Sequence, residues 1–445
     1  MEEYKIAIVN CWSDSDKGGS AIIFGMIKSI RKVIPKARFS LISMYSQSDP
    51  KYERAYRHLK RAFPDIHIYS SPIPNSRFIF RLKFPYKKRI WRLMSSLCLL
   101  ILCSRKFIFK NEAVKALQEA DVVLSAGGHY LRTSRSIKSL FELYFTAYPL
   151  LIAWRLGKPF GMYGHSFGPF HNKLSRHFIR WLLSKANFIG VRENFSKKEL
   201  IRCGVSTERI QLIPDAAFVL EPEFSERVCD ILNRNNLEPR KFVAVTVRHW
   251  YEIEITINGY RRYLQELAKS IDFIVDKLGF KVAIVLQNIR DIDAQLSDDL
   301  NDDLTAGKQI FDLLRCRNKS NVVLISDDLS SSELIALYRQ SLILVGARLH
   351  SILFALIAGT PSIAIAVSKH KTLGIMQILG LERYVLDSDF KSSDLIMLIK
   401  ELITERERIA KYIRTKVLIQ RGRALQVPQR LLSTIQDYTR DDLLS

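Results

Sequence analysis

Two arginines and a histidine follow apolar runs that have the composition of buried strands. Arg348 and His350 come directly after the run 342–345, and Arg248 follows the run 242–247 in the same way. In open α/β sheets, ligands bind beyond the carboxyl ends of the strands. Arginine presents a planar fork of hydrogen-bond donors that matches carboxylate and phosphate groups. These positions therefore predict a site for an anion.

The segment 341–371 reads as a strand, a polar turn, a helix and a second strand. An apolar stretch from 352 to 358 ends at Gly359, and a second apolar run, 363–367, stops at basic residues that include Lys371. This order is a βαβ unit, in which both strands end on the same edge of a sheet. Lys371 is accordingly expected beside the anion site. The alternative is that these cations are ordinary loop charges.

The charge of the chain points in the same direction. Its 445 residues carry a formal net charge of +23, which favours an anionic partner such as a phosphorylated small molecule, a nucleic acid or a membrane surface. Charge alone does not choose among them. The six cysteines are scattered without a C-x-x-C pair, so neither a zinc site nor a disulfide framework is expected, and a reducing cytoplasm is the expected compartment.

The alternation of apolar strand-like runs with helical segments continues along most of the chain. We expect an α/β fold with two Rossmann-like, doubly wound domains facing a cleft, and C-terminal helices packing back across the junction. The expected parts are an N-terminal domain of residues 1–222, a linker over 221–240, a second domain of residues 240–395 and basic helices over 396–445. The G-x-G-x-x-G pattern is absent near the first strand, so no nicotinamide cofactor is expected.

Residues 77–110 have a distinct composition. Basic and aromatic side chains alternate there without an acidic residue, and the apolar core 97–103 is too short to span a bilayer. Such a stretch can lie in a membrane interface, which would place the protein on the inner face of the membrane. It can equally form a helical lid that packs its apolar face on the domain. The composition leaves both interpretations open.

Several motifs along the chain resemble those of the polysaccharide pyruvyl transferase family. They are DVVLSAGG at 121–128, GHSFGP at 164–169, VRENFSKKELIRCG at 191–204, PDAAF at 214–218, VTVR at 245–248 and, most specifically, the segment 346–371. The resemblance implies a fold like the GT-B glycosyltransferases. It also implies transfer of pyruvate from phosphoenolpyruvate to a sugar, as a ketal, during synthesis of an envelope or exopolysaccharide. The first turn departs from the family pattern, because Asp16-Lys17-Gly18-Gly19-Ser20 stands where an Asn-x-Gly-Asp sequence is usual.

Phosphoenolpyruvate carries a carboxylate and a phosphate, so a site for it needs several cations. On this resemblance the donor-binding residues are Arg192, Arg248, Arg348 and Lys371. Arg192 also has a simpler interpretation as a local ion pair with Glu193, its neighbour in sequence. No organic cofactor or metal ion is expected.

Ketal formation requires a proton on the methylene carbon of the donor. Histidine ordinarily titrates near neutral pH and suits this general-acid step, and His350 is the predicted catalytic residue. His165 is the second choice. His129, His165 and Ser166 are predicted on the acceptor side, where a lipid-linked or nucleotide-linked sugar would bind. Asp215, which follows Pro214, is expected to cap a turn.

Two other functions fit parts of the sequence. A GT-B glycosyltransferase with a nucleotide-sugar donor shares the expected fold, since a fold does not determine a function. A nucleic-acid or membrane-surface binding protein would account for the net charge. The βαβ segment argues against a protein that binds by charge alone, so a nucleic-acid partner is not expected.

Overall fold

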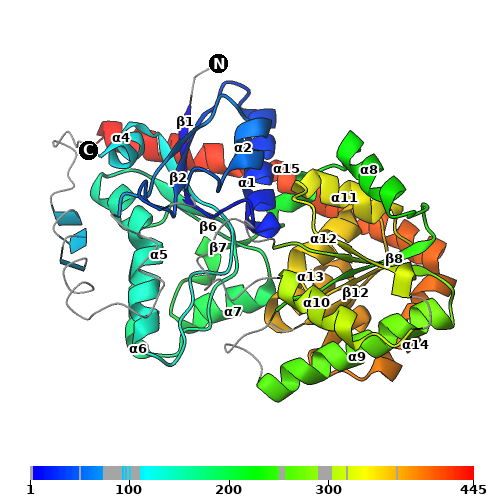
Figure 1. Cartoon of the computed structure of the whole chain (residues 1–445). Coiled ribbons are helices and arrows are strands. Elements are labelled where there is room, and N and C mark those ends of the chain that lie inside the picture. The colour runs from blue at the N-terminus through cyan, green and yellow to red at the C-terminus, as the bar shows by residue number, and fades with distance from the viewer. Residues whose placement is uncertain are drawn as a thin grey trace. The chain divides into compact units, whose positions relative to one another are not determined.

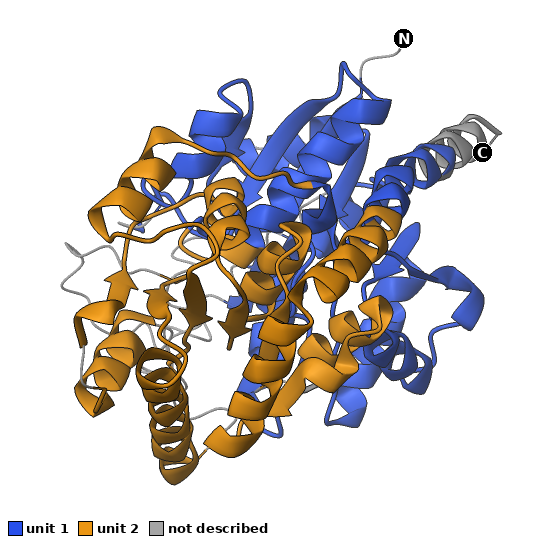
Figure 2. Cartoon of the chain, turned by 90° about the vertical axis from the view of Figure 1, so that its right-hand side faces the viewer, with its two compact units in different colours: residues 1–14, 19–219, 421–445 blue, residues 15–18, 220–420 orange. Residues whose placement is uncertain are grey.

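A computed structural model of the chain describes residues 4–49, 52–73, 93–94, 96–97, 100–101, 111–249, 256–288, 303–316, 319–366 and 369–444. The chain divides into two compact units (Figure 2). Unit 1 comprises Met1–Asp14, Gly19–Val219 and Arg421–Ser445, and unit 2 comprises Ser15–Gly18 and Leu220–Gln420. The basic-aromatic stretch 77–110 lies almost entirely outside the described residues, so the choice between a membrane segment and a lid stays a prediction.

Unit 1 is built on a parallel sheet, whose strands β1, β2, β6 and β7 are labelled in Figure 1. The sheet has seven strands among the described residues, in the order β3-β2-β1-β4-β5-β6-β7. The strands β4, β5 and β6 are buried along their whole length, as expected for a parallel sheet that helices cover on both faces. The strands are β1 (Lys5–Cys11), β2 (Arg38–Ser43), β3 (His67–Tyr69), β4 (Val122–Ser125), β5 (Phe160–His165), β6 (Phe188–Val191) and β7 (Ile210–Leu212). The helices are α1 (Lys17–Val33, of which Lys17 and Gly18 belong to unit 2), α2 (Arg57–Ala62), α4 (Glu112–Glu119), α5 (Lys138–Arg155), α6 (Lys173–Ser184) and α7 (Asn194–Arg202), with short 3-10 turns at Thr207–Arg209 and Ala216–Val219.

Unit 2 repeats this design with a parallel sheet that has six strands in the described part of the chain, in the order β10-β9-β8-β11-β12-β13. Its strands are β8 (Phe242–Thr246), β9 (Lys281–Val285), β10 (Val322–Ile325), β11 (Leu344–Gly346), β12 (Ser362–Ala366) and β13 (Val385–Asp387). Its helices are α8 (Glu226–Arg234), α9 (Ile257–Asp276), α10 (Asp303–Leu313), α11 (Ser331–Gln340), α12 (Leu349–Ile357), α13 (Lys369–Leu379), α14 (Ser392–Thr404) and α15 (Arg406–Leu444), with 3-10 turns at Lys319–Asn321 and Glu382–Tyr384. The residues of α15 up to Gln420 belong to unit 2, and those from Arg421 belong to unit 1.

The sequence correctly predicted two α/β units with parallel sheets. The βαβ segment is present as β11, α12 and β12, with the two strands paired in parallel. Gly359 follows the end of α12 with φ +77°, a backbone conformation that residues other than glycine rarely adopt. The basic C-terminal segment is helical, as α14 and α15. In the described part of the chain, no helix is both long and apolar enough to cross a bilayer.

One expected element was wrong. Residues 221–240 were expected to form a polar linker, but α8 occupies Glu226–Arg234. Val228 and Ile231 are buried on one face of this helix, and the hydroxyl of Ser225, which precedes it, donates to Glu333 Oε1 at 2.6 Å. Apolar residues three apart are enough to dock a short helix, although the segment is polar on average.

Candidate functional site

The order of the strands in unit 2 reverses between β8 and β11. β8 leads to β9 on one side of the sheet and β11 leads to β12 on the other, while β8 and β11 are themselves paired in parallel. Such a switch point creates a crevice beyond the carboxyl ends of the two strands. Arg248 follows β8, and Arg348 and His350 follow β11. Three of the residues singled out from the sequence therefore lie past the ends of two adjacent strands.

Hydrogen bonds tie the turn after β11 to the end of β8. The hydroxyls of Thr246 and Ser351 are 2.6 Å apart, and Ser351 Oγ also donates to the carbonyl oxygen of Arg348 at 2.7 Å. The backbone N–H of Ala347 donates to the carbonyl oxygen of Thr246 at 3.1 Å. All of the side chains in this network are buried or half-buried. The backbone that carries Arg348 and the first turn of α12 is consequently held against the neighbouring strand.

Arg348 forms an ion pair with a buried carboxylate. Its Nη2 donates to Asp303 Oδ1 at 2.6 Å and its Nε donates to Oδ2 at 2.8 Å, while the Asp303 side chain is fully shielded from solvent. The backbone N–H groups of Gln287 and Asn288 donate to the same Oδ2. Burial alone would lower the pKa of Arg348, but the charges of Asp303 and Asp16 raise it. The guanidinium is thus charged and oriented, with 16% of its side-chain surface still exposed.

His350 lies in the first turn of α12 and is half-buried. Its ring packs near that of Phe354, with 6.0 Å between the centroids. A Cβ on Gly18 would lie 2.1 Å from Nδ1 of His350, closer than side-chain carbons come to other atoms. The segment Ser15–Gly18 thus forms part of the surroundings of His350, and glycine is the residue that leaves room for the imidazole.

The same short segment is anchored in unit 2 by Lys17. Its side chain is 1% exposed and its Nζ forms an ion pair with Asp328 Oδ1. Ser331 Oγ donates to the carbonyl oxygen of Lys17 at 3.0 Å, and Asp16 Oδ1 accepts from the N–H of Gly18 at 3.1 Å. These contacts hold Gly18 against the imidazole.

Lys371 lies in the first turn of α13, beyond the end of β12. β12 pairs in parallel with β11, so Lys371 follows the same edge of the sheet as Arg348. The residue is half-buried. Within the described ranges, no group of histidine, cysteine and carboxylate side chains is assembled that could hold a metal ion.

Arg192 has a different environment from the other predicted donor-binding residues. It is 2% exposed in unit 1, and its Nη1 donates to Asp215 Oδ2 at 2.6 Å. Its Nε donates to Ser166 Oγ at 2.7 Å and lies 3.7 Å from Glu193 Oε2. Two of its three guanidinium nitrogens are thus occupied by neighbours in unit 1. This environment favours a structural ion pair, mainly with Asp215, and donor binding by Arg192 stays a prediction.

The three residues predicted on the acceptor side all belong to unit 1. His165 is fully buried, and its Nε2 lies 3.2 Å from the carbonyl oxygen of Ser125 and 3.3 Å from the hydroxyl of Tyr130. Burial lowers the pKa of His165 to about 3, against a smaller opposing effect of the hydrogen bond to Ser125. Ser166 is 1% exposed and donates to Glu193 Oε2. This closed environment does not suit acceptor contact by either residue.

His129 is the half-buried member of this group. Its Nε2 lies 2.6 Å from the carbonyl oxygen of Gly168. It follows β4 at the carboxyl edge of the sheet in unit 1. Asp215 accepts from the N–H of Ala217 at 2.9 Å, which confirms the expected turn cap, and it is in addition the partner of Arg192.

Comparison with known proteins decides the family. Residues 17–369 match the sequence profile of the family described as polysaccharide pyruvyl transferase. The chain belongs to the polysaccharide pyruvyl transferase family. One protein with a similar sequence is the amylovoran biosynthesis protein AmsJ of Erwinia amylovora. It is 26% identical over 399 residues, which cover 86% of this chain and 88% of AmsJ.

Solved structures show what fold this pyruvyl transferase family member has. A putative UDP-N-acetylglucosamine 2-epimerase from Listeria monocytogenes superposes with a TM-score of 0.60 at 12% identity, covering 99% of this chain and 98% of that protein. HepE from Anabaena, in complex with UDP-glucose, superposes with a TM-score of 0.57 at 12% identity, covering 98% and 100%. These similarities establish a GT-B-like fold.

Sequence reasoning missed two residues of the site in this pyruvyl transferase family member. Asp303 was not selected, because an aspartate at the start of a helix is an ordinary helix-terminal residue and its partner is 45 positions away. Gly18 was noted only as part of a departure from the family pattern. The adjacent pair Gly18-Gly19 was the available signal, since glycine marks close approach of the backbone to another group.

Proposed function

We propose that this protein transfers pyruvate from phosphoenolpyruvate to two hydroxyls of a sugar in an exopolysaccharide precursor, releasing phosphate and forming a cyclic ketal. The family assignment supports transfer to a polysaccharide. Phosphoenolpyruvate as the donor and a cyclic ketal as the product go beyond the family assignment and are our proposal. The single observation that carries it is the gathering of Arg248, Arg348 and His350 at the switch point of unit 2.

The proposed donor site has the charge that the donor requires. Phosphoenolpyruvate carries nearly three negative charges at neutral pH. Arg248, Arg348 and Lys371 offer three positive charges from the carboxyl ends of β8, β11 and β12. Arg348 is held by Asp303 through Nε and Nη2, so we assign its remaining exposed edge to the donor. An oriented arginine loses little side-chain freedom on binding, which favours affinity.

The chemical step begins with a proton transfer from the His350 imidazolium to the methylene carbon of the donor. This turns C2 into an electrophile, and the first sugar hydroxyl adds to it and returns its proton to the imidazole. The second hydroxyl then displaces phosphate at C2, the C–O bond to phosphate breaks, and the proton of that hydroxyl leaves with the phosphate. The arginines stabilise the charge that develops on the departing group.

A rate assay with one substitution tests this proposal. The full chain is incubated with phosphoenolpyruvate and lipid-linked or nucleotide-linked sugars, and phosphate release and the added pyruvate mass are followed. We expect His350→Gln to lower turnover by about 10²–10⁴-fold, while Arg248→Gln mainly weakens donor binding. The exposed Arg315→Gln, in the same unit, is the matched control for a lost positive charge.

Two results, one from ligand binding and one from turnover, would contradict the proposal. Thermal stabilisation by a uridine diphosphate sugar with none by phosphoenolpyruvate would favour a glycosyltransferase of the same fold. Full turnover in His350→Gln would remove the general-acid role of His350 and leave donor binding by the cations untouched.

A further inference from the structure

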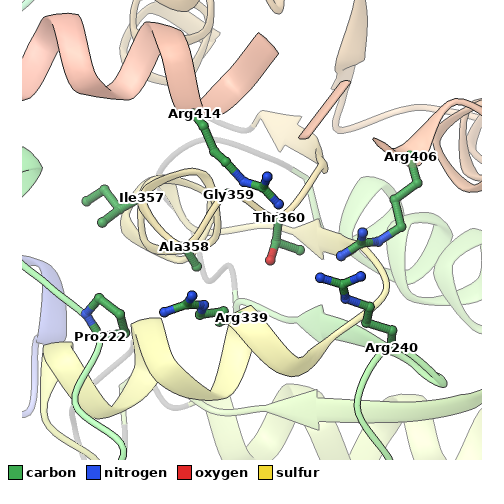
Figure 3. Close-up of a pocket in the computed structure, with 9 residues that line it drawn as sticks. All are labelled: Pro222, Arg240, Arg339, Ile357, Ala358, Gly359, Thr360, Arg406 and Arg414. Atoms are coloured by element: carbon green, nitrogen blue, oxygen red, sulfur yellow. The ribbon is translucent and has the colours of Figure 1, made fainter. Parts of the chain in front are cut away.

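Unit 2 contains a second cluster of cations, away from the proposed donor site. A pocket of about 270 Å³ is lined by Arg240, Arg339, Arg406 and Arg414. The arginines come from the residues before β8, the last turn of α11, the start of α15 and a position two turns further along α15. In Figure 3 the guanidinium groups of Arg240 and Arg406 lie beside each other, that of Arg414 extends toward Thr360, and that of Arg339 extends toward Pro222 and Ala358. None of these four arginines lies in the family motifs or takes part in the proposed reaction.

The pocket lies at the amino ends of the strands. Arg240 precedes β8, and Thr360, which also lines the pocket, precedes β12. The Nε of Arg406 donates at 2.9 Å to the carbonyl oxygen of Leu342, just before β11. The five residues of β8 separate the two edges of the sheet by about 15 Å, at about 3.3 Å per residue. The pocket and the proposed donor site are therefore on opposite edges of one sheet.

The positive charges of the pocket are incompletely balanced. Glu407 Oε1 lies 2.5 Å from Arg406 Nη1 and 3.5 Å from Arg240 Nη1, and its side chain is 70% exposed. The side chains of Arg339 and Arg414 have no hydrogen-bond or ion-pair partner among the described residues. Arg406 is buried, and burial together with the neighbouring charge of Arg240 lowers its pKa. Four guanidinium groups thus line one pocket, and Glu407 pairs with two of them, those of Arg406 and Arg240.

The backbone around the pocket is also specialised. Arg240 has φ +62°, a left-handed conformation that is uncommon for a residue other than glycine. A Cβ on Gly359 would lie 3.1 Å from Nε of Arg414, so the absence of a side chain lets the arginine pass close to the chain. The carbonyl end of α12, at Ala358, also lines the pocket. A helix end contributes only about half a negative charge, which does not account for four arginines.

We propose that this pocket is a binding site for a phosphate-bearing anion that carries at least two negative charges. Guanidinium groups bind phosphate oxygens in a bidentate manner, and a multivalent anion would relieve the repulsion among like charges. The volume is below that of a pocket for a drug-sized ligand, which favours a small group such as a diphosphate or a phosphomonoester. The group can belong to a free solute or to a lipid headgroup at a membrane surface.

The test uses the full chain and two probes. Titration calorimetry measures the Kd of pyrophosphate, and sedimentation measures binding to phosphatidic acid vesicles against neutral phosphatidylcholine vesicles. Arg339→Gln/Arg414→Gln is the test variant, because both side chains are exposed and Arg406, which holds the backbone, is left intact. Arg261→Gln/Arg315→Gln, at two exposed arginines of unit 2, is the charge-matched control, and Arg248→Gln reports on the donor site.

We expect the test variant to raise the Kd of the probe that binds by about tenfold or more, with the charge-matched control unchanged. A Kd raised in Arg248→Gln and not in the test variant would place the probe in the donor site and overturn the proposal. Loss of pyrophosphate binding identifies a soluble ligand, and loss confined to the vesicles identifies a headgroup. The proposal is overturned if the test variant binds both probes as the wild type does, or if neither probe binds the wild type. These results are independent of whether phosphoenolpyruvate is the donor.

Discussion

The α-carbon of Gly18 lies so close to the imidazole of His350 that a Cβ there would be 2.1 Å from Nδ1. The two residues are 332 positions apart in sequence, as the difference of their numbers shows, and both belong to unit 2. Lys17, buried and paired with Asp328, keeps the glycine in place. The altered first turn of this family member is thereby linked to the residue proposed as the general acid.

Gly18→Ala should slow pyruvyl transfer without unfolding the protein. The added methyl group must push the imidazole aside, and a misplacement of about 1 Å can lower the rate by about 10²-fold. The measurement is the initial rate of phosphate release from phosphoenolpyruvate at saturating donor. A circular dichroism spectrum and a melting curve establish that the variant is folded.

The control for this substitution is Gly422→Ala. A Cβ at Gly422 meets no atom within 4 Å, and alanine in a helix is about 1 kcal/mol more favourable than glycine. This variant should keep the wild-type rate. A Gly18→Ala enzyme as active as Gly422→Ala would mean that His350 tolerates displacement and is not the proton donor.

Asp303→Asn should both destabilise unit 2 and weaken donor binding. The substitution leaves Arg348 without its buried carboxylate partner, and breaking a buried ion pair costs about 3–5 kcal/mol. A disordered Arg348 should raise the KM for phosphoenolpyruvate more than it lowers kcat. Urea unfolding and steady-state kinetics measure the two effects separately. An unchanged KM in the folded fraction would show that Arg348 does not contact the donor.

Arg192→Met should affect stability and leave donor affinity alone. Arg192 is enclosed in unit 1 with Asp215 at 2.6 Å, so its removal leaves a buried carboxylate unpaired, at a cost of about 3–5 kcal/mol. The urea concentration at the midpoint of unfolding should fall, and the KM for phosphoenolpyruvate, measured without urea, should be unchanged. Arg202→Met is the comparison, because its side chain is 69% exposed and its ion pair with Glu199 should contribute about 1 kcal/mol or less. A raised KM in Arg192→Met alone would support its place in the donor site.

His165 should make the folded state sensitive to acid. The unfolded chain binds a proton at this residue with an ordinary pKa of about 6.5, whereas burial lowers the folded pKa to about 3. Between these values the unfolded state holds the extra proton, so the free energy of unfolding falls as pH falls, by about 1 kcal/mol per pH unit. Above about pH 6.5 this contribution is fully present. Urea unfolding of the wild type and of His165→Gln, measured at several pH values between about 4 and 7, compares the pH dependence of their free energies of unfolding. Parallel pH dependences in the two proteins would contradict the assignment.

Local patterns were enough to predict the strands and the edge of the sheet at which the site forms. The run before Arg348 is apolar and short, as a buried parallel strand must be, and becomes β11. Gly359 marked the end of α12 because a helix often ends at a glycine with positive φ, and that conformation is present. Residues 226–234 failed as a linker, since their average polarity concealed two buried apolar residues on one helical face.

The partners of charged residues could not be predicted in the same way. Arg192 and Arg348 look alike in sequence, since each follows an apolar run. Arg192 is buried with Asp215, whereas Arg348 pairs with Asp303 and keeps part of its surface exposed. Which carboxylate an arginine meets depends on how loops from distant positions return to the sheet, and no local spacing records that.

The sequence by itself determined the family, through the motifs and the profile that it matches. It also determined the two parallel sheets and the placement of Arg248, Arg348 and His350 after strands, because hydrophobic periodicity and turn residues act over short distances. Only the tertiary structure decided which of the predicted cations are enclosed, that Gly18 adjoins His350, and that four arginines from separate segments line one pocket. These facts depend on contacts between residues far apart in the chain, and burial and electrostatic pairing exist only after those contacts form.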